Sequence, residues 1–358
     1  MGGAERGHDI SRVRTVGLTV AILLVASLSL AFALTQPVSH GPARQLPGVR
    51  KSQASPESRV RGIADLKEVN YYPAADGWTY MWSRFDPTAI GRDFARIHAL
   101  GANTVRIIIQ PSVFGFPTVR PVMADRLSEV IGLAAKNSLR VHLTLFDWWS
   151  AYTDIHGSKE WVSSLLSRYR DDPRIAVVEL KNEIDPQSRV AVAWVTTMLS
   201  YLSTVLPGTL RTVSTTSVPP EFFALFTREL KSSPPSFWDY HYYGSAGDAY
   251  AVLSRIKVLA APRPLFVGET GYSTDAAPGD QSAQERAQAA YYRAVFTAAA
   301  ALGLPAPAPW ILDDFSSGGI PPESGIADEP AQYGYGLFQL NGTPKPAAAV
   351  VSRAFSGQ

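Results

Sequence analysis

Two glutamates stand where paired carboxylates could carry out acid–base or nucleophilic chemistry. Glu183 follows an apolar run in VVELKNEIDP, and Glu269 follows another in PLFVGETGY. Two carboxylates that flank a glycosidic bond can divide its hydrolysis, because one protonates the leaving oxygen while the other attacks the sugar carbon or activates water. A single glutamate of this kind is usually a solvated loop residue or an ion-pair partner. The interpretation therefore depends on both lying at one site.

Other kinds of chemistry have less support in the sequence. The chain has no cysteine, which excludes disulfides, thiolate metal ligands and a cysteine nucleophile. The six histidines show no paired ligand spacing, and the neighbours Asp313 and Asp314 are weak evidence for calcium. The sequence contains no glycine-rich phosphate loop, and GETG at 268–271 carries glutamate where a nucleophile elbow needs serine. We therefore expect neither a metal nor any other cofactor.

The two glutamates need a large folded domain to position them. The 358 residues are 46% hydrophobic and 18% charged, which suffices for a sizeable core, and the net charge of +2 is too small to indicate a nucleic-acid partner. From residue 60 to 358, short apolar runs alternate with amphipathic stretches, which predicts an α/β fold of the (β/α)8 TIM barrel type. The eight expected strands are Val69–Tyr72, Thr104–Ile109, Val141–Phe146, Ala176–Leu180, Arg211–Ser214, Asp239–Tyr243, Leu265–Val267 and Pro309–Leu312.

The amphipathic stretches between these runs are expected helices. The best-marked one begins at Asp86-Pro87, an N-cap followed by proline at the first helical position, and ends at Gly101. Pro219-Pro220 is expected to open a loop after the short, polar fifth run. The other expected helices are Ala124–Lys136, Ser158–Tyr169, Val190–Val205, Ala246–Ala260 and Ala283–Leu302.

The residues at the expected strand ends resemble those of a known group of enzymes. Asn182-Glu183 after the fourth strand and Glu269 after the seventh are similar to clan A glycoside hydrolases, most closely the cellulase-like glycoside hydrolase family five. The resemblance runs from about residue 69 to the end and includes DDPRIAVVELKNE and GLFQLNGTPKPAAAV. It implies a retaining hydrolase that cleaves β-glycosidic bonds of a polysaccharide or oligosaccharide, with Glu183 as the acid/base and Glu269 as the nucleophile.

The same resemblance implies roles in substrate binding. Asn182 would hydrogen-bond the sugar 2-hydroxyl, and Trp310 would stack on the sugar ring. Arg106 and Tyr243 would keep the nucleophile ionised, with His241 beside them in the barrel lumen.

The chain departs from the family pattern after the third strand. Many members have histidine there, whereas this chain reads VHLTLFDWW, with Phe146 at that place. The polar contact to the sugar would then come from Asp147. Large aromatic side chains often close loops onto a barrel, but they also form sugar subsites. The candidates for such subsites are Trp148, Trp149, Trp78 and Trp82.

The N-terminal region is predicted to direct the chain to a membrane. After a basic region at 1–14, residues 15–34 carry no charge and are long enough to cross a hydrocarbon core of about 30 Å. Ala31-Phe32-Ala33 also fits a signal peptidase site, so an uncleaved anchor and a cleaved signal peptide both remain open. Residues 35–59 form a proline-rich linker to the hydrolase domain at 60–358. The expected protein is a monomer that is secreted or anchored in the membrane, and it acts outside the cytoplasm.

Two alternatives to a hydrolase also remain open. A carbohydrate-binding pseudoenzyme on the cell surface would keep the aromatic residues without turnover, although the presence of both Glu183 and Glu269 disfavours it. A transglycosylase would pass the same covalent intermediate to a sugar hydroxyl in place of water.

Overall fold

The structure is a computed structural model that describes residues 62–275 and 279–357. The predicted segments at 1–14, 15–34 and 35–59 lie outside the described residues. Within the described ranges, no helix combines the length and the apolar character needed to cross a bilayer.

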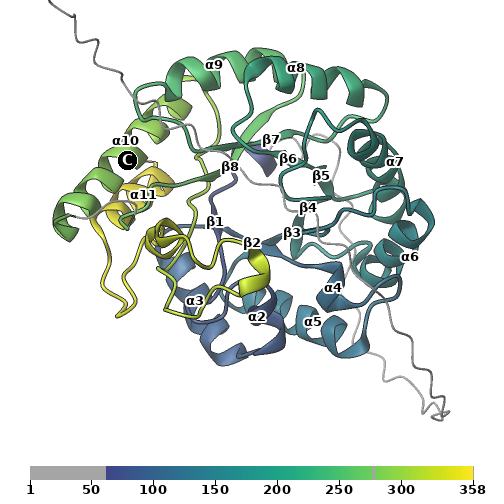
Figure 1. The fold of residues 1–358 in the computed structure, drawn as a ribbon, viewed down its shortest axis with the longest axis horizontal. Coiled ribbons are helices and arrows are strands. Elements are labelled where there is room, and N and C mark those ends of the chain that lie inside the picture. The colour runs from purple at the N-terminus through teal and green to yellow at the C-terminus, as the bar shows by residue number, and fades with distance from the viewer. Residues whose placement is uncertain (1–61, 276–278, 358) are drawn as a thin grey trace, which may run out of the picture. The chain divides into compact units, whose positions relative to one another are not determined.

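Parallel strands form the barrel that the alternating pattern predicts (Figure 1). The first sheet has the order β1 (Glu68–Asn70), β2 (Thr104–Ile108), β3 (Arg140–Thr144), β4 (Ile175–Glu179) and β5 (Leu210–Thr212). The second sheet has the order β6 (Ser214–Thr215), β7 (Trp238–Tyr242) and β8 (Leu265–Thr270). Only Val213 separates β5 from β6, so these two strands occupy one position and join the two sheets.

The barrel closes through the segment that was expected to be its eighth strand. Pro309 forms an isolated parallel bridge with Thr270 of β8, and its carbonyl accepts a hydrogen bond from the Asn70 N–H of β1 at 3.1 Å. The regular pairing here is shorter than the predicted Pro309–Leu312. Because Pro309 has no N–H, it cannot donate to a neighbouring strand, which limits the ladder at this position.

The strands are surrounded by helices (Figure 1). Their bounds are α2 (Thr79–Ser83), α3 (Pro87–Ala99), α4 (Pro111–Phe114), α5 (Pro121–Lys136), α6 (Ile155–Leu166), α7 (Arg189–Val205), α8 (Pro220–Glu229), α9 (Ala249–Ala260), α10 (Gln281–Ala301) and α11 (Pro346–Ser356). The expected loop at Pro219-Pro220 is wrong, because Pro220 is the first residue of α8. Proline is tolerated there since the first turn of a helix has no use for its N–H.

Helix α3 shows how the local sequence sets these boundaries. The Asp86 side chain accepts hydrogen bonds from two N–H groups of the first turn, at 2.9 and 3.1 Å. Ile90, Phe94 and Ile97 follow at helical spacing and are fully buried. Gly101 then takes a φ of 90°, which a residue with a side chain rarely adopts. The predicted start and stop of this helix are therefore confirmed.

The interior of the barrel is polar. Arg106 on β2 is fully buried, and its guanidinium contacts side chains from β1, β3, β4 and β8. One side chain reaches four other strands because all of them face the lumen. The neighbouring positions Val105 and Ile107 are equally buried, on the opposite face of β2, as the two-residue period of a strand requires.

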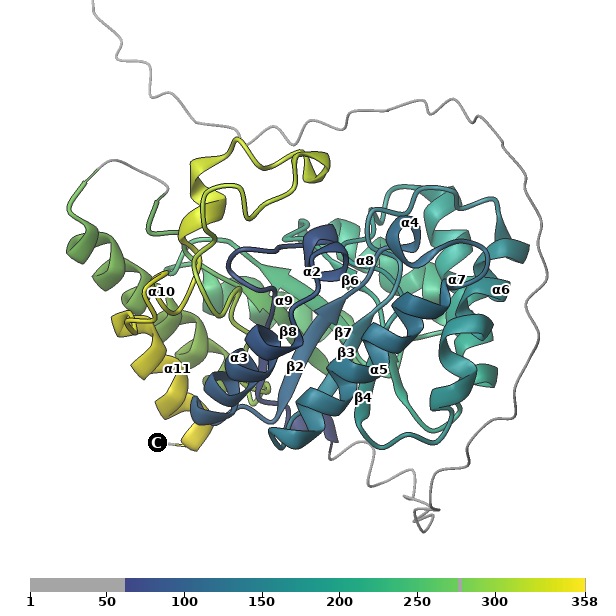
Figure 2. The same ribbon diagram turned by 90° about the horizontal axis from the view of Figure 1, so that it is seen from below.

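A long segment between the eighth strand position and α11 lies at the same end of the barrel as α2 and α4 (Figure 2). Two ion pairs hold its ends. Arg96 of α3 donates to both oxygens of Asp313, at 2.7 and 2.6 Å, and Lys345 Nζ donates to Asp314 Oδ1 at 2.6 Å. These contacts fix the segment beside the carboxyl ends of the strands.

Candidate active site

Glu183 and Glu269 come together at the carboxyl ends of the strands. One oxygen of each carboxylate and one nitrogen of His241 lie within 4.8 Å of one another. Glu269 lies in β8, whereas Glu183 stands in the loop after β4 with a left-handed φ of 49°. A non-glycine residue in this region of φ carries backbone strain of about 1–3 kcal/mol, and such residues cluster at functional sites. We call Glu183, Glu269, His241 and Tyr243 the mouth group.

The two glutamates occupy different environments. The Glu269 side chain is only 7% exposed, whereas the Glu183 side chain is 33% exposed. Arg106 Nη1 donates to Glu269 Oε1, and the Tyr243 hydroxyl donates to Oε2 at 2.9 Å. Burial raises the pKa of Glu269, while His241 and Arg106 partly oppose that effect. Glu269 therefore has both oxygens held by donors, whereas part of the Glu183 side chain is open to solvent.

His241 lies between the two glutamates. Its Nδ1 is 2.9 Å from Glu183 Oε1 and 3.4 Å from Glu269 Oε2. Burial alone would lower the pKa of His241, but Glu269 and Glu183 raise it to about 9. The ring is therefore cationic at neutral pH, and its Nδ1–H can be donated to either glutamate.

Arg106 connects the nucleophile candidate to the rest of the lumen. Besides Glu269, its guanidinium donates to Thr144 Oγ1 at 3.0 Å, Glu179 Oε2 at 2.8 Å, Asn70 Oδ1 at 2.8 Å and Asn182 Oδ1 at 2.9 Å. The planar fork of arginine suits this many fixed partners. Sequence reasoning predicted the contact with Glu269 but missed those with Asn70, Thr144 and Glu179.

Asn182 is held at both ends of its amide. Its oxygen accepts from Arg106, and its Nδ2 donates to Asp147 Oδ1 at 3.4 Å. The other oxygen of Asp147 accepts from Gln110 Nε2 at 3.1 Å, and only 3% of Asp147 is exposed. With both oxygens engaged, Asp147 is better suited to orient Asn182 than to contact a sugar directly.

The tryptophans divide into exposed and buried ones. Trp148 is 38% exposed and takes a positive φ of 57°. Trp310 is 7% exposed, and its ring packs 6.0 Å from Trp78 and 6.1 Å from Tyr72 between centroids. Trp82 has no exposed surface and donates from its indole to the Ile108 carbonyl, so the expectation that it forms a sugar subsite is wrong. The half-buried Trp149 packs on Phe116 and Phe146.

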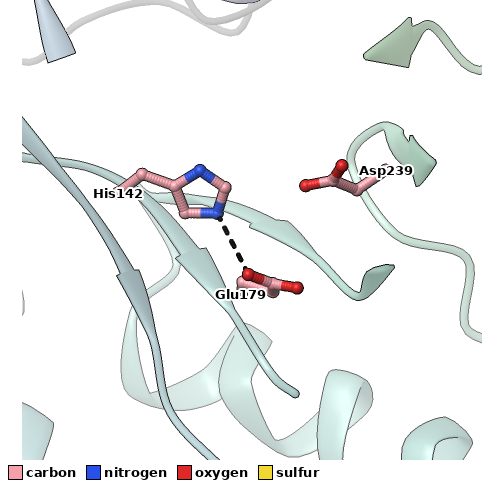
Figure 3. Close-up of side chains that lie close together, drawn as sticks. All are labelled: His142, Glu179 and Asp239. Carbon is pink, nitrogen blue, oxygen red and sulfur yellow. Dashed lines mark ion pairs between the residues drawn. The ribbon is translucent and has the colours of Figure 1, made fainter. Parts of the chain in front are cut away.

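A second set of ionisable side chains occupies the lumen and was missed from the sequence. It consists of His142 on β3, Glu179 on β4 and Asp239 on β7, all with 0–1% exposure, and we call it the lumen group. Figure 3 shows the three side chains turned toward one another. One atom from each lies within 4.8 Å of the others, a spacing that could hold a metal ion. The expected absence of metal ligands considered spacing along the chain, whereas these residues meet only across strands.

No family model matches the chain, and no curated protein matches it by sequence.

Solved structures match its fold. The GH5_18 glycoside hydrolase from Streptomyces cattleya, in complex with GlcNAc, is 20% identical over 81% of this chain and 80% of that one, with a TM-score of 0.64. A GH5_18 variant from Bifidobacterium longum subsp. longum, in complex with Manb1-4GlcNAc, is 15% identical over 82% and 78%, with a TM-score of 0.67. The exo-beta-1,4-mannosidase Op5Man5 from Opitutaceae bacterium strain TAV5 is 19% identical over 81% and 59%, with a TM-score of 0.63. The α/β barrel fold predicted from the sequence is therefore confirmed.

Proposed function

We propose that this chain is a retaining β-glycosidase. The observation that carries the proposal is the approach of a Glu183 oxygen to within 4.8 Å of a Glu269 oxygen at the mouth of an α/β barrel. Carboxyl groups about 5–5.5 Å apart are typical of retaining enzymes, whereas inverting enzymes keep them about 6.5–9.5 Å apart to admit a water. The observed closeness supports attack by a carboxylate on the sugar itself.

The different surroundings of the two glutamates support a division of roles. Glu269 is buried and accepts from Arg106 and Tyr243, which suits an ionised nucleophile. Glu183 is nearer solvent and paired with His241, which suits a group that first gives a proton to the leaving oxygen and then takes one from water. Asn182 precedes Glu183 in the chain and shares Arg106 with Glu269, and its fixed amide suits a hydrogen bond with the sugar 2-hydroxyl.

β-Mannosides are the substrate class that we propose to test first. The solved neighbours include an exo-beta-1,4-mannosidase and a GH5_18 variant in complex with Manb1-4GlcNAc. The exposed ring of Trp148 offers a face on which a sugar can stack. We further propose that the enzyme acts outside the cytoplasm, which the uncharged segment at 15–34 supports.

Mechanism-based labelling tests the proposal directly. A 2-deoxy-2-fluoro-β-mannosyl fluoride, and then its glucosyl counterpart, should form a stable ester with Glu269 that peptide mass spectrometry locates. Glu183→Ala should still be labelled with an activated leaving group, and added azide should restore its turnover by replacing the base-activated water. Glu269→Ala should lose labelling but keep measurable binding. Glu221→Ala, which removes an exposed glutamate of α8, is the matched control and should behave like the wild type.

The product pattern separates the alternatives. Release of the β-anomer first, seen by NMR, supports retention, and sugar–sugar products would identify transglycosylation through the same intermediate. Oligosaccharide binding with neither label nor turnover across a panel of β-glycosides would favour the pseudoenzyme and overturn the proposal.

A further inference from the structure

Four buried polar atoms in the lumen have no hydrogen-bond partner. They are His142 Nε2, Glu179 Oε1, Asp239 Oδ2 and His241 Nε2. Each belongs to a side chain with no more than 1% exposure. A buried polar atom without a partner is rare in a native structure and needs an explanation, such as a bound water or ion.

These atoms belong to side chains that face one another. His142 Nε2 is 3.8 Å from Glu179 Oε2, and His241 Nε2 is 4.0 Å from Asp239 Oδ1 (Figure 3 shows the lumen group). The other oxygens are already engaged, because Glu179 Oε2 accepts from Arg106 and Asp239 Oδ1 accepts from the Gly268 N–H at 3.0 Å. Each carboxylate thus has one oxygen held in place and one oxygen free to bind something else.

The His142 ring has the orientation expected of a histidine that binds a metal through Nε2. Its Nδ1 lies 3.0 and 3.1 Å from the two oxygens of Glu68, a buried carboxylate on β1. A hydrogen bond from Nδ1–H to a carboxylate leaves the lone pair of the neutral ring on Nε2. Histidines that bind metals almost always have such an outer carboxylate or carbonyl, which fixes the tautomer and raises the basicity of the ligand.

The charges around this cluster favour a cation. Glu68, Glu179 and Asp239 bring three carboxylates, while the only permanent cation that contacts them among the described residues is Arg106, which also binds Glu269. This excess of negative charge in a buried space favours a divalent cation.

We propose that His142, Glu179 and Asp239 bind one divalent cation of the Zn²⁺ type inside the barrel. One nitrogen and two oxygen ligands match the preferences of Zn²⁺, whereas Mg²⁺ and Ca²⁺ prefer oxygen alone.

The site is structural. It is fully buried behind the mouth group, so a sugar cannot reach it, and its ligands come from β3, β4 and β7, which lie in both sheets of the barrel. A cation there holds these strands together. One of its ligands, Asp239, also lies 4.0 Å from His241 Nε2 through Oδ1, which connects the site to the ring that faces Glu183 and Glu269.

Metal content and cobalt substitution test the site in the full chain. The protein is made without a histidine tag in zinc-supplemented medium and purified without chelator. Mass spectrometry of the metals should find about one zinc per chain. After zinc is removed with a strong chelator, Co²⁺ should bind with about one equivalent, give the visible absorption bands of a four- or five-coordinate ion, and raise the melting temperature.

Variants locate the ion. Asp239→Asn keeps the Oδ1 acceptor for Gly268 but loses one ligand, and it should abolish the zinc content and the cobalt bands. Glu68→Gln should weaken cobalt binding by about 10–100-fold, as expected for an outer carboxylate. His98→Gln removes an exposed histidine of α3 and should retain the metal.

The outcomes separate this site from the proposed catalysis. A folded wild-type chain that holds no zinc and shows neither cobalt bands nor a melting shift would overturn the proposal. Zinc retained by a folded Asp239→Asn would place the ion elsewhere and also overturn it. If Asp239→Asn does not fold, the wild-type measurements decide. None of these readouts depends on glycosidase activity.

Discussion

The mouth group and the lumen group contain the same kinds of side chain but differ in their access to solvent. At the mouth, both oxygens of Glu269 have donors, the Glu183 side chain is 33% exposed and Tyr243 is 36% exposed. In the lumen group, every side chain is buried and each has an atom without a partner, a state that only His241 shares at the mouth. Groups that must bind a substrate and exchange protons need access to solvent. Buried charges need fixed partners, and their loss is costly because a remaining charge cannot be solvated.

The largest expected effect is on stability, from Glu179→Gln. Arg106 would stay buried but lose one of its two carboxylates, and removing one partner of such a pair typically costs about 3–5 kcal/mol. Glu183→Gln makes the same change at the mouth, where the side chain is 33% exposed and the amide oxygen can still accept from His241 Nδ1, and it should cost about 1 kcal/mol or less. Urea denaturation of both variants measures the difference. Equal losses would show that the two groups are not energetically distinct.

For activity we expect the reverse order, with Glu183→Gln losing more turnover than Glu179→Gln. Folded Glu183→Gln should lose nearly all turnover of substrates with poor leaving groups, because no acid remains to protonate the leaving oxygen. Together the two measurements distinguish a side chain that performs chemistry from one that holds the barrel together.

The fold could be predicted because its signals are local or periodic. The apolar runs placed the strands, and the cap at Asp86 placed α3. Helices α8 and α11 were not predicted, since each begins at a proline that also reads as a loop signal. The eighth strand was predicted too long because its hydrogen bonds depend on which strands lie on either side.

The mouth group could be predicted because its members follow the apolar runs and match a family pattern. The lumen group could not, because His142, Glu179 and Asp239 lie inside the runs and converge only when the barrel closes. A signal was nevertheless present. Polar residues recur at every second position in EVN of β1 and RVHLT of β3, as expected for a polar lumen with an apolar outer face.

The next largest effects are expected from two tryptophans, one buried and one exposed. Trp310→Ala should lower the free energy of unfolding by about 3 kcal/mol, since the ring packs on Trp78 and Tyr72 and is 7% exposed. The resemblance implies that this ring stacks on the sugar, so that its loss would lower kcat/KM more than stability, and the buried packing changes that expectation. Trp148→Ala should leave stability within about 0.5 kcal/mol but lower kcat/KM about 10-fold or more through the lost sugar contact. Urea denaturation and steady-state kinetics check both. A destabilised Trp148→Ala with normal kinetics would assign that ring to packing.

The smallest and most specific effect is expected from Tyr243→Phe. The hydroxyl donates to Glu269 Oε2 at 2.9 Å, and a donor to a carboxylate favours its ionised form. Burial already raises the pKa of Glu269 above its ordinary value, and loss of this donor raises it further. Because the nucleophile must be ionised, the acid limb of the pH profile of kcat/KM should move to higher pH. The loss of kcat/KM should therefore be largest at low pH and smallest on the plateau of the profile, where kcat/KM should fall about 10-fold.

Tyr250→Phe is the matched control for this profile, since it removes a hydroxyl from an exposed tyrosine of α9. It should leave the acid limb and the plateau unchanged. Both variants should unfold at nearly the wild-type denaturant concentration, because each change removes one hydroxyl and leaves the aromatic ring in place. A folded Tyr243→Phe with an unshifted acid limb would mean that Glu269 does not titrate as the nucleophile. Glu269, which is buried with Arg106, would then belong with the structural carboxylates of the lumen. His241 would be the residue at which the mouth group and the lumen group meet.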